Sequence, residues 1–183
     1  FAVPRKYWDM YDPGEIPLAI NPEIPEGAPL WSMNSMYELR HYDGFGHIGH
    51  PSSSYRMNED TARILKHGYY ASVSYIDALL GELFTHMKEL GIYEHTIIIV
   101  WGDHGWKLGD YGSWCKHTNF EMDTNAPLIF SVPWMEEKGV KTPSLAEFVD
   151  IYPTLCELAD LELPDHLEGQ SLAIIMEVPF VEV

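Results

Sequence analysis

The clearest pattern of apolar and polar positions lies in residues 58–91, where apolar side chains recur every three or four residues. This spacing predicts a long helix with one apolar face. Asn58 is suited to cap its start, with Glu59 and Asp60 at the positive end of the helix dipole. Gly91 is suited to end it. The apolar positions are Ile64, Leu65, Val73, Ile76, Leu79, Leu80, Leu83, Phe84, Met87 and Leu90.

Two short apolar runs without polar alternation predict buried strands at 96–101 and 127–132. A second helix is predicted over 144–159, and Pro153 inside it predicts a kink or a split. Because strands and helices alternate along the chain, we expect an α/β fold in which helices flank a mainly parallel sheet. The last residues, 176–183, are interpreted as an edge strand, where a proline is tolerated.

The first 57 residues lack a regular period and are interrupted repeatedly by proline, which fixes φ and removes a donor. Only PRKYWDMY, residues 4–11, predicts a short helix, with Pro4 in its first turn. We therefore expect an irregular, proline-rich arm and loop over 1–57, followed by the α/β part over 58–183.

Composition limits the classes of function. The chain has 183 residues and a formal net charge of −17, which argues against a nucleic-acid partner. An anionic substrate would need local positive charge to overcome this field. No run of about 18 apolar residues occurs, so no membrane span is predicted. The two cysteines, Cys115 and Cys156, form no CxxC pair, which argues against a disulfide scaffold.

The strand at 96–101 runs into a loop rich in glycine and tryptophan, WGDHGWKLGDYGSWCKH. In open α/β sheets, ligands bind at the carboxyl ends of strands, where Asp103 and His104 would lie. The carboxylate of Asp103 suits Ca²⁺ or Mg²⁺, whereas the imidazole of His104 favours Zn²⁺ or Mn²⁺. Two ligands are too few for any of these ions, so the others must come from elsewhere. The alternative is a glycine-rich turn in which Asp103 caps the segment that follows.

Two other groups of polar residues also allow two interpretations. Lys116 either lies in solvent with its stem on apolar surface, or faces an anion beside the metal. The segment HYDGFGHIGH contains His41, His47 and His50, and the spacing of the last two would allow zinc chelation. No cysteine or carboxylate cluster accompanies these histidines, so a surface loop near a pocket mouth is the simpler interpretation.

The segment DHGWKLGDYGSWCKHTNF resembles the C-terminal signature of the sulfatase family, in which a strand ends in DHG and a lysine follows. The resemblance covers residues 1 to about 172 and is closest to the iduronate-2-sulfatase group. It implies an alkaline-phosphatase-like α/β fold and hydrolysis of sulfate esters on a sulfated sugar. The other segments that carry it are FAVPRKYWDMY, YYASVSYIDALLGEL, TIIIVWGDHGW, APLIFSVP and FVDIYPTLCELADLELP.

The resemblance also implies roles for individual residues. Asp103 and His104 match two ligands of the family's calcium ion, and Lys116 matches the catalytic lysine that contacts the substrate sulfate. Trp106 matches a tryptophan that lines the sugar pocket. His117 stands in this substrate-binding segment where a tyrosine is expected, and a GEHG segment of the family reads GDYG here. These two departures concern the identity of the substrate rather than the reaction class.

Family sulfatases carry a C/S-x-P/A-x-R motif whose cysteine or serine becomes the formylglycine nucleophile, and no such segment occurs here. We therefore expect the C-terminal portion of a longer enzyme, inactive alone, whose partner is its own N-terminal half. The resemblance implies a periplasmic, secreted or lysosomal place without choosing among them. Two alternatives stay open: a related metal-dependent hydrolase of phosphonate or phosphate monoesters, and a non-catalytic metal-binding module.

Overall fold

The computed structural model describes residues 2–33, 35–50, 55–136 and 138–177. By its contacts the chain divides into two compact units, 1–131 and 132–183, and each is described by itself. The boundary at residues 131/132 is defined by contacts in the structure. The division predicted after residue 57 was instead based on where the regular sequence pattern begins. No helix among the described residues is long and apolar enough to cross a membrane.

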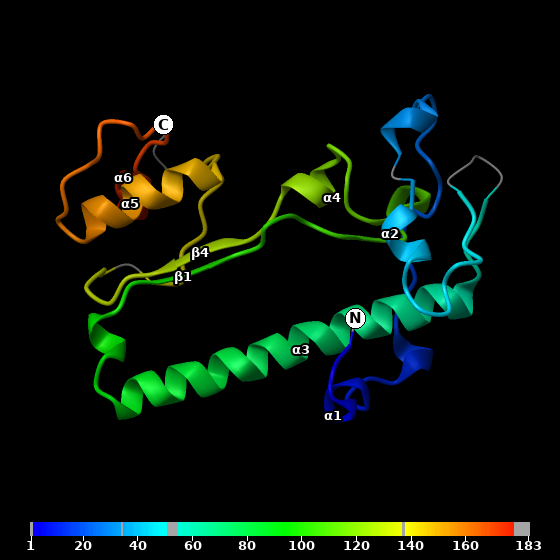
Figure 1. Cartoon of the computed structure of the whole chain (residues 1–183), viewed down its shortest axis with the longest axis horizontal. Coiled ribbons are helices and arrows are strands. Elements are labelled where there is room, and N and C mark those ends of the chain that lie inside the picture. The colour runs from blue at the N-terminus through cyan, green and yellow to red at the C-terminus, as the bar shows by residue number, and fades with distance from the viewer. Residues whose placement is uncertain (1, 34, 51–54, 137, 178–183) are drawn as a thin grey trace. The chain divides into compact units, whose positions relative to one another are not determined.

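The long helix α3 spans Glu59–Glu89 and dominates the first unit (Figure 1). The side chain of Asn58 accepts hydrogen bonds from the backbone N–H groups of Asp60 and Thr61, which confirms the predicted cap. At the other end, Gly91 has a φ of +70°, the left-handed conformation that favours glycine after a helix. The sequence therefore predicted this helix and both of its ends correctly.

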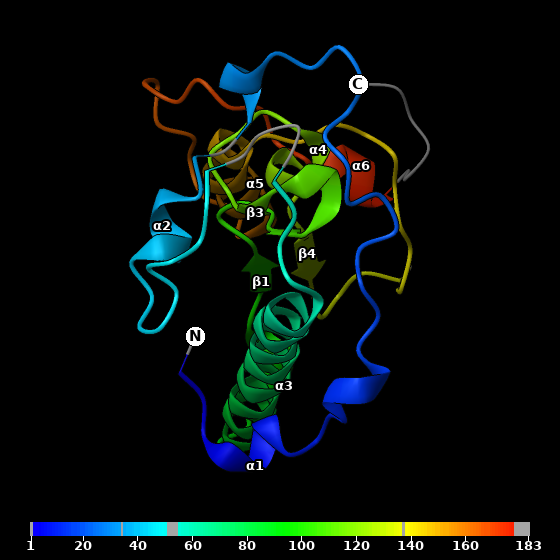
Figure 2. The same ribbon diagram turned by 90° about the vertical axis from the view of Figure 1, so that its right-hand side faces the viewer.

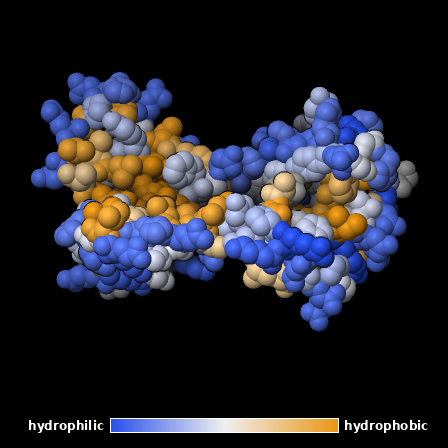
Figure 3. Space-filling model, turned by 60° about the horizontal axis from the view of Figure 1, so that its bottom comes forward, coloured by the Kyte–Doolittle hydropathy of each residue, from blue (hydrophilic) through white to orange (hydrophobic). Residues whose placement is uncertain are grey.

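Among the described residues, the buried side chains of α3 lie in its N-terminal part, from Ala62 to Ala71. The short helix α1, Arg5–Trp8, lies against it in Figures 1 and 2, with the rings of Tyr7 and Tyr75 5.1 Å apart. Further along, several apolar side chains of α3 are exposed, and Figure 3 shows apolar residues gathered on part of the molecular surface. These exposed residues are Val73, Ile76, Leu79 and Leu83.

After α3, a 3₁₀ turn at Tyr93–His95 leads into strand β1, Ile98–Trp101. It pairs antiparallel with β4, Leu128–Ser131, so that Ile98 lies opposite Ser131. A second antiparallel pair joins β2, Lys107–Leu108, to β3, Trp114–Cys115.

The two predicted strands thus exist, but the described strands pair antiparallel rather than parallel. The physical reason lies in the connection between β1 and β4. A parallel pair needs a crossover connection, usually through a helix that packs on the sheet. Here the intervening chain forms only the β2–β3 pair, a 3₁₀ turn at Asp110–Gly112 and the four-residue helix α4, Glu121–Thr124.

The arm over 1–57 is mostly irregular, as predicted, but it contributes to the core. Its elements besides α1 are 3₁₀ turns at Pro13–Glu15 and Leu30–Ser32 and the helix α2, Tyr37–Arg40. Residues from α2 and its flanks pack against the start of α3 and against β3. The buried members of this cluster are Met36, Leu39, Ile48, Ala62, Leu65, Trp114 and Cys115.

In the second unit, the predicted helix over 144–159 is shorter than expected. A 3₁₀ turn at Phe148–Asp150 leads directly into α5, Ile151–Leu158, and residues 144–147 belong to no helix. Pro153 lies in the first turn of α5, where its missing N–H breaks no hydrogen bond, so it neither kinks nor splits the helix.

The C-terminal region also differs from the prediction where it is described. A short helix, α6, spans Ala173–Glu177, so the first two residues of the predicted edge strand, Met176 and Glu177, are helical. The rest of that segment, 178–183, lies outside the described residues.

Candidate functional site

The loop after β1 is fixed by two backbone hydrogen bonds to the chain that precedes β4. The N–H of Gly102 donates to Pro127 O at 2.9 Å, and that of Gly105 donates to Asp123 O at 2.8 Å. A Cβ atom at Gly105 would lie 1.9 Å from Met122 O, a backbone atom that cannot move aside easily. Glycine is therefore required at 105 because the two segments approach too closely for any side chain.

Asp103 and His104, the predicted metal ligands, lie side by side on this loop. The Asp103 side chain is 83% exposed, and its Oδ2 lies 3.4 Å from Nε2 of His104. The other ring nitrogen, Nδ1, lies 2.8 Å from the carbonyl oxygen of Gly105. If Nδ1 carries the proton and donates to this carbonyl, Nε2 of a neutral imidazole presents a lone pair toward the carboxylate.

This arrangement fits the binding of a cation. The lone pairs of the carboxylate and of Nε2 face each other at 3.4 Å, so they repel unless a proton or a cation lies beside them. In addition, histidines that bind metals in proteins commonly donate their second ring N–H to a backbone carbonyl or a carboxylate, as Nδ1 of His104 would to Gly105 O. Among the described residues, however, no group of three or more His, Cys, Asp or Glu side chains could hold a metal ion. This chain thus offers two ligand atoms of a site, and the metal role of Asp103 and His104 stays a prediction.

Trp106 joins the DHG loop to Lys116. The indole stacks on the His104 ring at 5.9 Å between centroids and on the Tyr69 ring of α3 at 6.5 Å. The Lys116 ammonium lies 4.9 Å from the centre of the Trp106 ring, within the range of a cation–π contact. The structure therefore brings four of the five predicted site residues into one continuous set of contacts.

His117, the fifth, joins the set through Glu38 of α2, which the sequence analysis did not identify. Its carboxylate lies 3.0 and 3.1 Å from Lys116 Nζ and 3.4 Å from His117 Nε2. The Tyr42 hydroxyl donates to the same carboxylate at 3.2 Å. Burial alone would raise the pKa of Glu38, but the hydrogen bond and the charge of Lys116 outweigh it and lower that pKa. Glu38 is therefore an ionised partner of the predicted sulfate-binding lysine.

A buried polar network involves residues on both sides of Lys116 in the same loop. The ammonium of Lys107, which is fully buried, contacts a carboxylate oxygen of Asp123 and donates to Thr118 Oγ1 at 2.9 Å. The same carboxylate accepts from the backbone N–H of Thr118 at 2.8 Å. Burial lowers the pKa of Lys107, against the opposing effect of Asp123. This network ties β2 to the chain just after Lys116.

Neither cysteine has the surroundings of a nucleophile. Both are buried thiols, and burial raises the pKa of Cys115 to about 12.

The backbone at Cys115 and His117 is left-handed, with φ of +65° and +80°, on either side of Lys116. Such conformations are uncommon in residues other than glycine and occur where the surroundings impose them.

The histidine-rich loop gives no support to the zinc interpretation. His41 Nδ1 lies 2.8 Å from Tyr37 O, and His47 Nδ1 lies 3.1 Å from Gly44 O, so both rings interact locally with backbone. Neither belongs to a group of three metal-binding side chains in the part of the chain that the structure describes. The loop is therefore best described as a surface loop with local hydrogen bonds.

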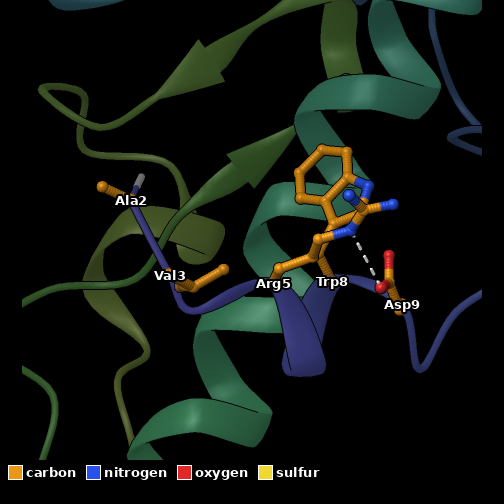
Figure 4. Close-up of a pocket in the computed structure, with 5 residues that line it drawn as sticks. All are labelled: Ala2, Val3, Arg5, Trp8 and Asp9. Atoms are coloured by element: carbon orange, nitrogen blue, oxygen red, sulfur yellow. Dashed lines mark hydrogen bonds and ion pairs between the residues drawn. The ribbon is translucent and has the colours of Figure 1, made fainter.

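A surface hollow of about 430 Å³ lies beside α1, away from the predicted residues in sequence (Figure 4). The residues that line it are Ala2, Val3, Arg5, Trp8 and Asp9. Its two charged side chains satisfy each other, with Arg5 Nε 3.1 Å from Asp9 Oδ2. None of the predicted site residues lines it, so the candidate site is the loop after β1.

Comparison with known proteins also relates this chain to sulfatases. The sulfatase family model matches residues 31–161. Human iduronate 2-sulfatase is 31% identical over 90% of this chain and 34% of its own length. Arylsulfatase K from Bos taurus is 28% identical over 82% of this chain and 26% of its own length. The chain thus spans about a third of the length of the iduronate 2-sulfatase that it matches.

Solved structures with the same fold come from two kinds of enzyme. The phosphonate monoester hydrolase SpPMH from Silicibacter pomeroyi has a TM-score of 0.72 and 28% identity, covering 98% of this chain and 35% of the other. BT4656, solved with its substrate D-glucosamine-2-N,6-O-disulfate, has a TM-score of 0.64 and 26% identity. That match covers 68% of this chain and 25% of the other.

These relatives confirm the expected alkaline-phosphatase-like α/β class, of which this chain contains a part. The family model covers well over half of the residues, including every predicted site residue from Asp103 to His117. The chain belongs to the sulfatase family.

Proposed function

We propose that this chain is the C-terminal portion of an enzyme that hydrolyses sulfate esters on a sulfated sugar. One observation carries the proposal: in a sulfatase-family chain, His104 of the DHG loop and Lys116 both contact the ring of Trp106. An acid–imidazole pair, an aromatic surface and an ammonium group thus lie in one region. A sulfated sugar presents an anionic group and an apolar ring face, which such a region complements.

The proposed roles follow from the chemistry of each side chain. Lys116 contacts the sulfate oxygens and stabilises negative charge that develops as the ester bond breaks. Trp106 packs against the sugar ring, and His117 binds substrate beside Lys116. Asp103 and His104 supply two ligands for Ca²⁺, which, when bound, would polarise the sulfate group and favour an ionised nucleophile. The remaining ligands belong to the segment that this chain does not include.

The nucleophile is also proposed to lie on that segment, as formylglycine. The two thiols of this chain are buried, and neither stands in a C/S-x-P/A-x-R motif. The exposed apolar side chains of α3 support a partner segment, because an uncovered apolar helix face is costly in water. The proposed partners are therefore a sulfated sugar and the N-terminal half of the same enzyme, without which the chain is inactive.

A second candidate is hydrolysis of phosphonate or phosphate monoesters. It is favoured by the likeness to SpPMH, which covers 98% of this chain at 28% identity. Sulfate and phosphonate monoesters carry one negative charge, whereas phosphate monoesters carry two near neutral pH, so an internal acid beside the lysine disfavours the phosphate monoester. Glu38 is such an acid, so its contact with Lys116 argues against a phosphate monoester, and the match to the sulfatase family favours sulfate over phosphonate.

The test compares turnover of an aryl sulfate, an aryl phosphate and an aryl phosphonate monoester by the protein that carries this chain with its upstream segment. We expect the sulfate to be the preferred substrate. Preference for the phosphonate would establish the second candidate, and no turnover of any ester would overturn both. Lys116→Ala should lower turnover while leaving calcium binding unchanged. Full turnover by this variant would refute the proposed role of Lys116.

The metal proposal has its own readout. Asp103→Asn should weaken calcium binding, measured by isothermal titration calorimetry, along with activity. Asp165→Asn provides the matched control, because Asp165 is an exposed aspartate of the second unit. Equal calcium affinity in the Asp103 variant and the parent would refute the assignment, whatever the variant does to turnover.

A further inference from the structure

Glu38 holds Lys116 from a distant part of the sequence. The two residues are 78 positions apart, and their side chains are 27% and 24% exposed, so the pair is partly shielded from water. The Lys116 ammonium is enclosed between the Glu38 carboxylate at 3.0 Å and the Trp106 ring at 4.9 Å. An ion pair of this kind limits the directions that a flexible lysine can take.

The backbone on both sides of this pair is held firmly. Glu38 lies between Met36 and Leu39, whose side chains are almost completely buried in the core cluster. Lys116 follows Cys115, a member of the same cluster, and is flanked by two left-handed residues. Both partners are thus attached to the core within two residues, which makes their contact a fixed feature of the fold rather than a surface ion pair.

We propose that Glu38 is a positioning residue for Lys116, which fixes the ammonium over Trp106 and offsets part of its attraction for an anion. This inference rests on the proposed function, in which Lys116 contacts sulfate. Positioning serves turnover, because a lysine fixed in the productive direction loses no freedom when substrate binds. Because the Glu38 carboxylate offsets part of the charge of Lys116, sulfate formed by the reaction is bound less tightly and can leave as product.

Two substitutions separate positioning from charge. Glu38→Gln keeps an acceptor for the ammonium but removes the negative charge, so inorganic sulfate should inhibit several-fold more strongly and kcat should fall. Glu38→Asp keeps the charge but withdraws it by one methylene, so kcat should fall by roughly ten- to a hundredfold with sulfate inhibition nearer to that of the parent. A residue that only supports the fold would lower the thermal midpoint in both variants without changing the inhibition constant for sulfate.

The matched control is Glu89→Gln. Glu89 is an exposed glutamate at the end of α3 that contacts His86 Nδ1 at 2.9 Å, so it repeats the acid–imidazole contact away from the site. Its kinetic constants and sulfate inhibition should equal those of the parent. If Glu38→Gln and Glu38→Asp also equal the parent in both quantities, the positioning role is wrong.

A second measurement is independent of the reaction. The lysines are reductively ¹³C-methylated, which keeps their charge, and the Lys116 signal is identified by its absence in Lys116→Arg. Glu38→Gln should shift this signal, and Glu89→Gln should not. An unchanged signal would refute the contact itself, whereas a shifted signal in a protein that cleaves no sulfate ester would refute the proposed function alone.

Discussion

Lys107 illustrates how much a single residue can depend on its partner. Its ammonium is fully buried in β2 and is balanced by Asp123, whose carboxylate also accepts from Thr118. Removing one partner of a buried pair leaves an uncompensated charge and costs about 3–5 kcal/mol. Neutralising both partners leaves no such charge, although it removes the same ion pair.

We therefore expect Asp123→Asn to be strongly destabilising and the double variant Lys107→Met/Asp123→Asn to be more stable than that single variant. The measurement is the free energy of unfolding from urea titration. Glu121→Gln is a suitable control, because Glu121 is an exposed acid on the same short helix that contacts only Asn125 among the bonds described. Additive effects of the two substitutions would show that the pair is not coupled.

The Cys115 thiol is predicted to resist alkylation. Burial raises its pKa to about 12, so the thiolate that reacts is scarce at pH 8 and is also inaccessible. We expect iodoacetamide to leave Cys115 unmodified in the folded protein and to modify it in urea, as read by peptide mass spectrometry. Rapid modification of the folded protein at pH 8 would contradict its burial.

At this scale the sequence singled out the residues of the DHG loop and Lys116 as candidates, because their types and spacing are local. It could not identify Glu38, since no local pattern distinguishes this glutamate from others on a surface helix and its partner lies 78 positions away. Nor did it identify the buried network of Lys107, because a lysine within a glycine-rich loop is ordinarily taken as solvated. Contacts between distant segments thus completed the candidate site.

At the scale of elements, close approach of two segments decides whether a glycine can be replaced. Gly105→Ala would place a Cβ atom 1.9 Å from Met122 O, whereas Gly81, exposed within α3, has no atom within 4 Å of an added Cβ. We expect Gly105→Ala to be strongly destabilising, because the DHG loop must separate from the segment before β4.

Gly81→Ala is the matched substitution, and it should stabilise the helix by roughly 0.5–1 kcal/mol. Both variants are compared with the parent by urea unfolding. If the two substitutions had similar effects, the tight contact at Gly105 would be absent in solution.

The elements themselves were predictable to different degrees. The helix α3 follows from its apolar period and from Asn58, both of which are local signals. The antiparallel pairing of β1 with β4 was not predictable, because the alternation of strands and helices does not specify which strands are neighbours. The start of α5 was placed too early, because residues 144–146 are compatible with a helix in composition, whereas the capping box of Glu147 and Asp150 starts the helical segment only at Phe148.

For the whole molecule, several large apolar side chains are uncovered, and the chain spans about a third of the length of the iduronate 2-sulfatase that it matches. Ile129 of β4 and Trp101 of β1 are more than half exposed, as are Val73 and Ile76 of α3. We expect the chain alone to bind the dye ANS strongly, and the protein with its upstream segment to bind little. Equal dye binding would contradict the idea that this segment covers these residues.

Both partners of the Glu38–Lys116 pair are direct neighbours of core residues, Leu39 and Cys115. Loss of the core would therefore release the lysine at once, so a partly unfolded protein could not keep an intact anion site. By mass action, any anion that binds only the folded form must shift the balance toward folding. Under the proposed role of Lys116, sulfate, as product or as buffer salt, would thus protect the interior of this protein against heat as well as occupying its surface.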